Sequence, residues 1–78
     1  MIGKALKYMR TQKRIKQEDL AKLLNIGQST LSDYENEKIS INYDTIEKIA
    51  KKCDYTIIFK NNLTNEKWQV KDLKRKDV

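Results

Sequence analysis

The stretch QEDLAKLLNIGQSTLSDYENEK, residues 17–38, decides how this chain folds. Residues 17–24 and residues 28–36 each repeat apolar side chains at helical spacing, which predicts two short amphipathic helices. The tripeptide Asn-Ile-Gly at 25–27 separates them, and asparagine tolerates the left-handed backbone that a tight turn between helices needs. We expect the inward side chains of this unit to be Leu20, Ala21, Leu23, Leu24, Ile26, Leu31 and Tyr34.

Two further helices are predicted on either side of this unit. Residues 2–13 repeat apolar side chains at helical spacing, which predicts an amphipathic helix with a basic outer face. Asn42 is a good N-cap for a helix over residues 43–53. The inward side chains would be Ile2, Ala5, Leu6 and Met9 in the first helix, and Ile46, Ile49, Ala50 and Cys53 in the last.

The hydrophobic period changes after residue 54. Apolar and polar residues alternate over 55–60 and again over 67–71, as in half-buried β-strands. Residues 61–65, Asn-Asn-Leu-Thr-Asn, have the composition of a turn. The sequence therefore predicts a β-hairpin over residues 55–71, followed by a frayed basic tail over residues 72–78.

Composition excludes several classes of function. Seventy-eight residues suit one small domain, and no apolar run approaches the ~18 residues of a membrane helix. The single Cys53 cannot form an internal disulfide, and the chain has no His, the commonest general base and metal ligand. We expect a cytoplasmic protein that is not an enzyme and that binds no cofactor or metal ion.

The net charge of +6 makes nucleic acid the first partner to consider. Residues 1–16 contain six basic side chains and no acidic one, whereas residues 17–37 contain one basic and five acidic side chains. Residues 60–78 contain six basic and three acidic side chains. A lysine-rich end is equally consistent with a solvated surface, so charge alone does not identify the partner.

The central stretch resembles the lambda-repressor-like, Cro-type helix-turn-helix regulators, also called the xenobiotic-response-element type. The matching positions are Gln17, Leu20-Ala21, Ile26, Gln28, Leu31-Ser32, Tyr34-Glu35, Asn36 and Lys38. The resemblance covers about residues 2–54. It implies a mainly α fold: a four- to five-helix helix-turn-helix bundle over residues 1–54, here followed by the C-terminal β-hairpin.

The resemblance also implies which residues contact double-stranded DNA. The second helix of the unit would lie in the major groove. The base-reading residues would be Gln28, Ser29, Ser32 and Asp33, and the backbone-contacting residues would be Lys16, Gln17, Arg10, Asn36 and Lys38. Arg10 and Glu35 match a pair that forms a structural salt bridge in relatives. For each polar position, the alternative is an ordinary solvent-facing helix surface.

The chain departs from the family pattern at several helix ends. Lys16 and Gly27 replace the usual Ser or Thr N-caps, and a lost cap costs roughly 1 kcal/mol. Asn25 replaces the turn glycine, and Glu37 replaces the glycine after the recognition helix. We expect Asn36 to adopt the left-handed conformation that this missing glycine would supply.

The predicted hairpin needs a partner for its apolar side chains, because an isolated two-stranded hairpin is marginal in water. We expect a homodimer joined by this segment through Tyr55, Ile57, Ile58, Phe59, Trp68 and Val70. The alternative is a hairpin that only covers the helical core of its own chain. A dimer would place two recognition helices about one DNA turn apart and predicts a palindromic operator.

The favoured function is therefore a sequence-specific transcriptional regulator, in particular a repressor that binds DNA as a homodimer. One alternative is an antitoxin that also represses its own operon and carries a toxin-binding surface. Another is a protein-interaction module that keeps the fold without reading DNA. An enzyme has almost no support in the sequence, and RNA binding is supported by charge alone.

Overall fold

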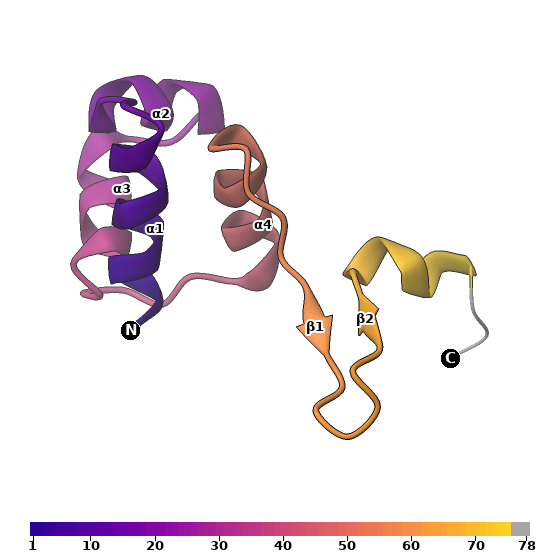
Figure 1. The fold of residues 1–78 in the computed structure, drawn as a ribbon. Helices are drawn as coiled ribbons and strands as arrows, with labels where there is room; N and C mark the ends of the chain where they lie inside the picture. The colour runs from indigo at the N-terminus through magenta and orange to yellow at the C-terminus, as the bar shows by residue number, and fades with distance from the viewer. Residues whose placement is uncertain (76–78) are drawn as a thin grey trace.

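Four α-helices and a small hairpin follow one another along the chain. The computed structural model describes residues 1–75 (Figure 1). The helices are α1 (Ile2–Gln12), α2 (Gln17–Leu24), α3 (Gln28–Glu35) and α4 (Tyr43–Lys52). Strands β1 (Phe59–Lys60) and β2 (Lys67–Trp68) follow, and then a 3-10 helix, η1 (Val70–Arg75). The predicted helical bundle and hairpin are confirmed, with four α-helices.

The four helices pack around a small apolar core. Both α1 and α2 contact α3 and α4, so α3 and α4 lie on opposite sides of the bundle (Figure 1). The buried apolar residues are Leu6, Leu20, Ala21, Leu31, Ile49, Ala50 and Cys53. A partly buried layer packs against them: Met9, Ile15, Leu24, Ile26, Tyr34, Ile41 and Ile46. Every helix therefore contributes to the core.

Three side chains that were predicted to face the core lie at the surface. Leu23 is 55% exposed, and Ile2 and Ala5 are exposed as well. Gly3 is buried in their place. A Cβ atom at Gly3 would lie 2.5 Å from the carbonyl oxygen of Glu35. The missing side chain thus lets the start of α1 approach the end of α3, a backbone contact that hydrophobic spacing does not reveal.

Each of the four α-helices ends in a Schellman motif, in which two N–H groups bond back to the last turn around a left-handed residue. In α1, the N–H of Arg14 donates to the carbonyl of Thr11 at 3.0 Å, and the N–H of Ile15 donates to Arg10 at 3.1 Å. The four left-handed residues are Arg14, Asn25, Glu37 and Asp54, with φ between 58° and 64°. None of them is glycine, so a Cβ atom is strained at each motif.

The left-handed residue after α3 is not the one predicted from the sequence. Asn36 has φ −90° and ψ 3°, whereas Glu37 has φ 60°. The hydrogen bonds explain the difference, because the N–H of Lys38 reaches the carbonyl of Asp33 only if the chain reverses at Glu37. The prediction for Asn25 is confirmed, with φ 58°.

The N-termini of the helices differ in how they are capped. Among the described residues, no side chain caps α2 at Lys16 or α3 at Gly27. Asn42 caps α4, since its side-chain oxygen accepts the N–H of Thr45 at 2.8 Å. The cap predicted for α4 is therefore confirmed.

The hairpin is shorter than predicted. Its two strands pair antiparallel, with Phe59 opposite Trp68 and Lys60 opposite Lys67. The rings of Phe59 and Trp68 stack with centroids 4.8 Å apart, and Tyr43 of α4 lies 6.4 Å from Phe59. The prediction that residues 55–58 belong to a strand is wrong.

Hydrogen bonds at both ends limit the strands. At the start, the N–H of Tyr55 bonds to the carbonyl of Ala50 at 2.8 Å as part of the motif that ends α4. At the other end, the Asp72 carboxylate accepts the N–H of Gln69 at 2.8 Å and so caps η1. Val70, which was predicted to continue the second strand, therefore begins a 3-10 helix.

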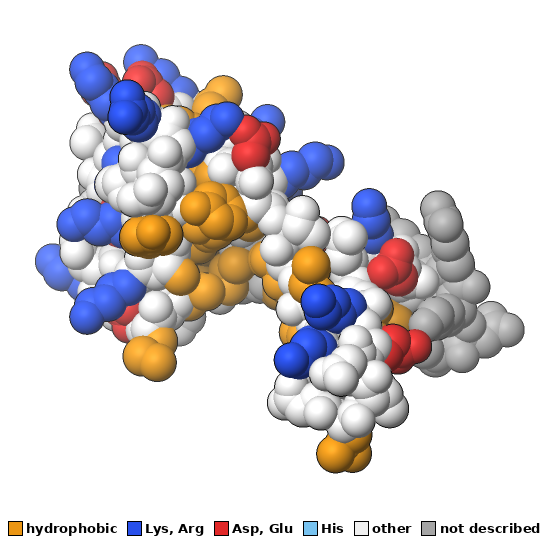
Figure 2. All heavy atoms as spheres, in the orientation of Figure 1, with side chains coloured by type: hydrophobic (Ala, Val, Ile, Leu, Met, Phe, Trp, Pro, Cys, Tyr) orange, Lys and Arg blue, Asp and Glu red, His pale blue; other side chains and the backbone are white. Residues whose placement is uncertain are grey.

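We call residues 55–75 the arm. The arm leaves the bundle at the end of α4, on the side away from α3 (Figure 1). Figure 2 shows hydrophobic side chains in the angle between the bundle and the arm. The predicted basic tail enters η1 up to Arg75, and its last residues, 76–78, lie outside the described part of the chain. Within residues 1–75, no helix is long and apolar enough to cross a membrane.

Candidate nucleic-acid interface

The second helix of the helix-turn-helix unit exposes polar side chains at its first turn. Gln28 and Ser29 are exposed, and Ser32 and Asp33 are half-buried one turn later. Leu31 is fully buried on the opposite face of α3, where it anchors the helix to the core. The surface of α3 that remains outside is narrow and polar, as expected of a helix that enters the major groove.

A buried ion pair fixes the end of α3 against α1. Arg10 and Glu35 are only 8% and 5% exposed. The guanidinium donates through Nε to Glu35 Oε2 at 2.6 Å and through Nη2 to Glu35 Oε1 at 3.0 Å. Its Nη1 donates to the carbonyl of Ile15 at 2.9 Å. Two-point pairing of this kind sets the orientation as well as the distance of the two helices.

This burial determines what Arg10 can do. The sequence places it with the basic outer face of α1 and with the DNA-backbone contacts. In the structure, all three guanidinium nitrogens already donate to protein oxygens. Arg10 therefore holds the bundle together, and we do not propose it as a phosphate ligand.

A chain of hydrogen bonds leads from the ion pair to the exposed face. Gln17 Nε2 donates to Glu35 Oε1 at 3.1 Å. Because a carboxylate only accepts, this bond directs the amide oxygen of Gln17 outward. That oxygen accepts from Gln28 Nε2 at 3.4 Å. The ion pair thus positions two predicted DNA-contacting residues, a connection that needs the tertiary structure to be seen.

The next turn of α3 joins a predicted base reader to a predicted backbone contact. Asn36 Nδ2 donates to Ser32 Oγ at 3.2 Å. Asn36 is exposed, and Ser32 is half-buried beneath it. The exposed lysines Lys16 and Lys38 lie just before α2 and just after α3, so positive charge lies at both ends of the unit.

A comparison with protein families matches residues 6–59 to HTH_3, a helix-turn-helix family. The chain belongs to the HTH_3 family. The members of this family are Cro/C1-type, lambda-repressor-like domains that bind DNA. The match covers more than half of the 78 residues and confirms the resemblance of residues 17–38. No curated protein and no solved structure matched the chain.

The family assigns DNA binding to this HTH_3 domain, and the geometry shows which side chains are available for it. Gln28, Ser29, Lys16 and Lys38 are exposed, Gln17 is held in a network, and Arg10 is occupied. The remaining reactive group, Cys53, is buried against the core, and burial raises the pKa of its thiol. Its place and its raised pKa agree with the predicted role of a small apolar core residue.

Proposed function

We propose that this HTH_3 protein is a transcriptional repressor that binds a palindromic operator as a homodimer. The observation that carries the proposal is the exposed Gln28, held by Gln17 and the buried Arg10–Glu35 pair at the start of α3. A pre-oriented side chain loses little conformational entropy when it binds a base. A protein that occupies an operator in this way blocks other proteins from the same DNA.

Gln28 is suited to adenine. Its bond to Gln17 uses one of the two N–H groups of Nε2. The other N–H and the amide oxygen remain for N7 and N6 of an adenine in the major groove. Ser29 lies beside it and can contact either base or phosphate. Asp33 would accept a hydrogen bond from the amino group of a cytosine and reject bases that offer only acceptors there.

The phosphate contacts come from the ends of the helix-turn-helix unit. Lys16, Gln17, Asn36 and Lys38 are the proposed backbone ligands. Residues 17–37 themselves carry one basic and five acidic side chains, so attraction to DNA depends on the basic residues around them. Since each neutralised phosphate releases counterions, we expect affinity to fall steeply with salt, at about −0.9 in log–log slope per contact.

The homodimer is assigned to the arm. Its proposed interface residues are Tyr55, Ile57, Ile58, Phe59, Trp68 and Val70. The arm lies on the α4 side of the bundle, away from α3 (Figure 1), which supports contact with a protein while α3 faces DNA. Two copies related by a two-fold axis would present their α3 helices to successive major grooves, roughly 34 Å apart. We place this non-enzymatic activity in the cytoplasm.

The exposed apolar surface of the arm also supports a second candidate, an antitoxin or interaction module. In that case, the arm would bind a different protein, and the helix-turn-helix unit would still repress the operon that encodes both. Tyr55, Ile58 and Phe59 are each at least two-fifths exposed, which suits either kind of partner.

Selection from a random duplex DNA pool at ~150 mM salt tests the proposal. We expect a palindromic motif with adenine at the position that Gln28 reads. Gln28→Ala should weaken binding by about 1–3 kcal/mol per half-site and lose the preference for that adenine. The matched control is Gln12→Ala, an exposed glutamine at the end of α1, which should leave binding unchanged.

The outcomes separate the two candidates. Recovery of unselected DNA, or a selected motif that Gln28→Ala leaves unaltered, would reject sequence reading by α3. A sedimentation mass equal to one chain, with and without the selected DNA, would reject the homodimer but leave sequence-specific binding in place. The arm would then be assigned to another protein.

A further inference from the structure

Leu63, at the tip of the arm, is 94% exposed and sits on a well-ordered loop. The side-chain oxygen of Asn61 accepts the N–H groups of Leu63 at 2.9 Å and Thr64 at 3.3 Å. The N–H of Asn61 donates to the carbonyl of Glu66 at 2.7 Å, and the N–H of Asn65 donates to the carbonyl of Asn61 at 2.7 Å. These bonds hold the loop and present an apolar side chain that the chain itself does not bury.

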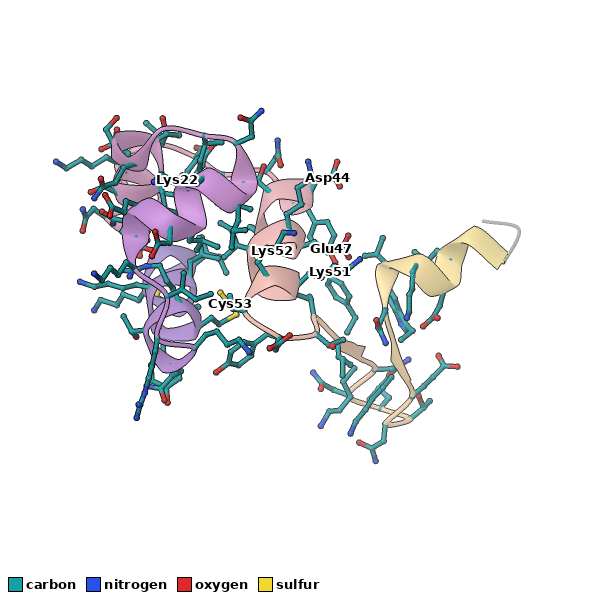
Figure 3. The ribbon with its side chains drawn as sticks, turned by 90° about the horizontal axis from the view of Figure 1, so that it is seen from above. Lys22, Asp44, Glu47, Lys51, Lys52 and Cys53 are labelled. Atoms are coloured by element: carbon teal, nitrogen blue, oxygen red, sulfur yellow. The ribbon has the colours of Figure 1, made fainter. Side chains whose placement is uncertain are left out.

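A groove of about 380 Å³ lies at the other end of the arm. It is lined by Glu47, Ala50, Lys51, Tyr55, Thr56, Ile57, Gln69 and Lys71. Three of these residues, Ala50, Tyr55 and Ile57, give it apolar surface, and the charged residues supply its polar part. Figure 3 shows Glu47 and Lys51 on the side of α4 that faces the arm. Such a mixture suits an apolar side chain that is accompanied by a charge.

The arm carries the exposed leucine at its tip and the groove at its base (Figures 1 and 2). The loop cannot fold back into the groove of its own chain, because strands β1 and β2 separate them. Two arms that lie side by side in opposite directions would place each tip at the base of the other. We infer that a second copy of this chain docks in this way, with Leu63 of each copy in the groove of its partner.

Charge complementarity favours a second copy over nucleic acid. The loop over residues 61–66 contains one acidic side chain, Glu66, and no basic one. The groove contains Lys51, Lys71 and Glu47 and is therefore net positive. A negative loop matches a positive groove in both directions across a two-fold axis, whereas Glu66 would repel phosphate. Ile58, 53% exposed and midway between base and tip, would be covered by the same docking.

This inference rests on the homodimer of the proposed function and specifies its contacts. Sedimentation equilibrium of the full chain tests it with the variant Leu63→Asp. Because each dimer buries two copies of Leu63, we expect the dissociation constant of the dimer to rise at least about 100-fold. The matched control is Leu23→Asp, the same change at an exposed leucine of α2, which should leave the dissociation constant unchanged.

A charge exchange identifies the groove as the receiving site. Glu66→Lys and Lys71→Glu should each weaken the dimer by about tenfold, since each places like charges together. The double variant should regain most of the loss, because the opposite charges then meet across the interface. Helical circular dichroism of each variant confirms that the bundle is folded.

Each outcome decides the inference. Weakening by Leu63→Asp together with rescue by the double charge exchange supports it. A dimer that Leu63→Asp leaves intact overturns this docking and leaves the proposed homodimer standing. Additive losses in the double variant reject the groove as the partner of the loop. A wild-type chain that stays monomeric overturns both the docking and the homodimer, while the DNA selection still tests base reading separately.

Discussion

The helical bundle and the arm are stabilised in different ways. The bundle buries apolar side chains from four helices and a two-point ion pair between Arg10 and Glu35. The arm has two strands of two residues each and a stack of Phe59 on Trp68 with Phe59 still 40% exposed. A chain of this size has few apolar residues to bury. It uses them in the bundle, and the arm is left with apolar surface that a partner can cover.

Loss of the buried ion pair should have the largest effect on this comparison. Arg10→Met leaves the Glu35 carboxylate buried without its cation, so we expect the free energy of unfolding to fall by about 3–5 kcal/mol. Urea unfolding followed by helical circular dichroism measures this loss. Arg10→Met combined with Glu35→Leu should recover part of it, because no charge then remains buried.

The control for this prediction is an exposed ion pair of the same bundle. Lys13 pairs with Asp54, whose hydrogen bond raises the pKa of Lys13. Both side chains are solvated, so Lys13→Met should leave the urea midpoint nearly unchanged. Equal losses in Arg10→Met and Lys13→Met would show that burial does not distinguish the two pairs.

The second prediction asks whether the arm and the bundle unfold together. Leu31→Ala removes a fully buried side chain and should cost about 2–5 kcal/mol of bundle stability. Phe59→Ala removes the stack on Trp68 and should cost the bundle no more than about 1 kcal/mol. Trp68 is the only tryptophan, so its fluorescence reports on the arm while circular dichroism reports on the helices.

We expect Phe59→Ala to shift the Trp68 emission to longer wavelength and to leave the helical urea midpoint nearly in place. If both signals lose stability to the extent seen for Leu31→Ala, the arm and the bundle form one cooperative unit and the contrast between them fails.

The smallest effect concerns strain at the helix ends. Arg14 adopts the left-handed conformation after α1, and a Cβ atom is strained there. Arg14→Gly should therefore raise the free energy of unfolding by about 1 kcal/mol, which corresponds to a Tm increase of roughly 4–8 °C. Arg14→Ala is the matched control, because it removes the same charge and keeps the Cβ atom. An equal gain in both variants would assign the effect to charge and not to strain.

Much of the bundle could be predicted from the sequence, because its signals are local. Helical spacing gave the four helices to within a residue or two at most ends, and Asn42 and Asn25 marked a cap and a turn. The Arg10–Glu35 pair followed from the family resemblance. The strands of the hairpin were overextended, since alternation over 55–58 does not register the hydrogen bonds that end α4 or that Asp72 forms.

The candidate site divides along the same line. The family pattern indicates Gln17 and Gln28 as DNA-contacting residues, but only packing connects them to Glu35. Arg10 has the charge of a phosphate ligand, yet its neighbours in space occupy all of its guanidinium nitrogens. Charge and residue type are properties of the sequence, whereas the availability of a side chain depends on its surroundings.

The sequence by itself determined the helix-turn-helix unit, its polar outer face and the basic ends of the chain, because period, turn chemistry and charge are encoded locally. Only the tertiary structure decided that Gly3 brings α1 against α3, that four left-handed residues end the helices, and that the arm leaves on the side of α4. These features depend on which backbones and carbonyls meet in space. Such meetings involve residues far apart in the chain, and local patterns do not record them.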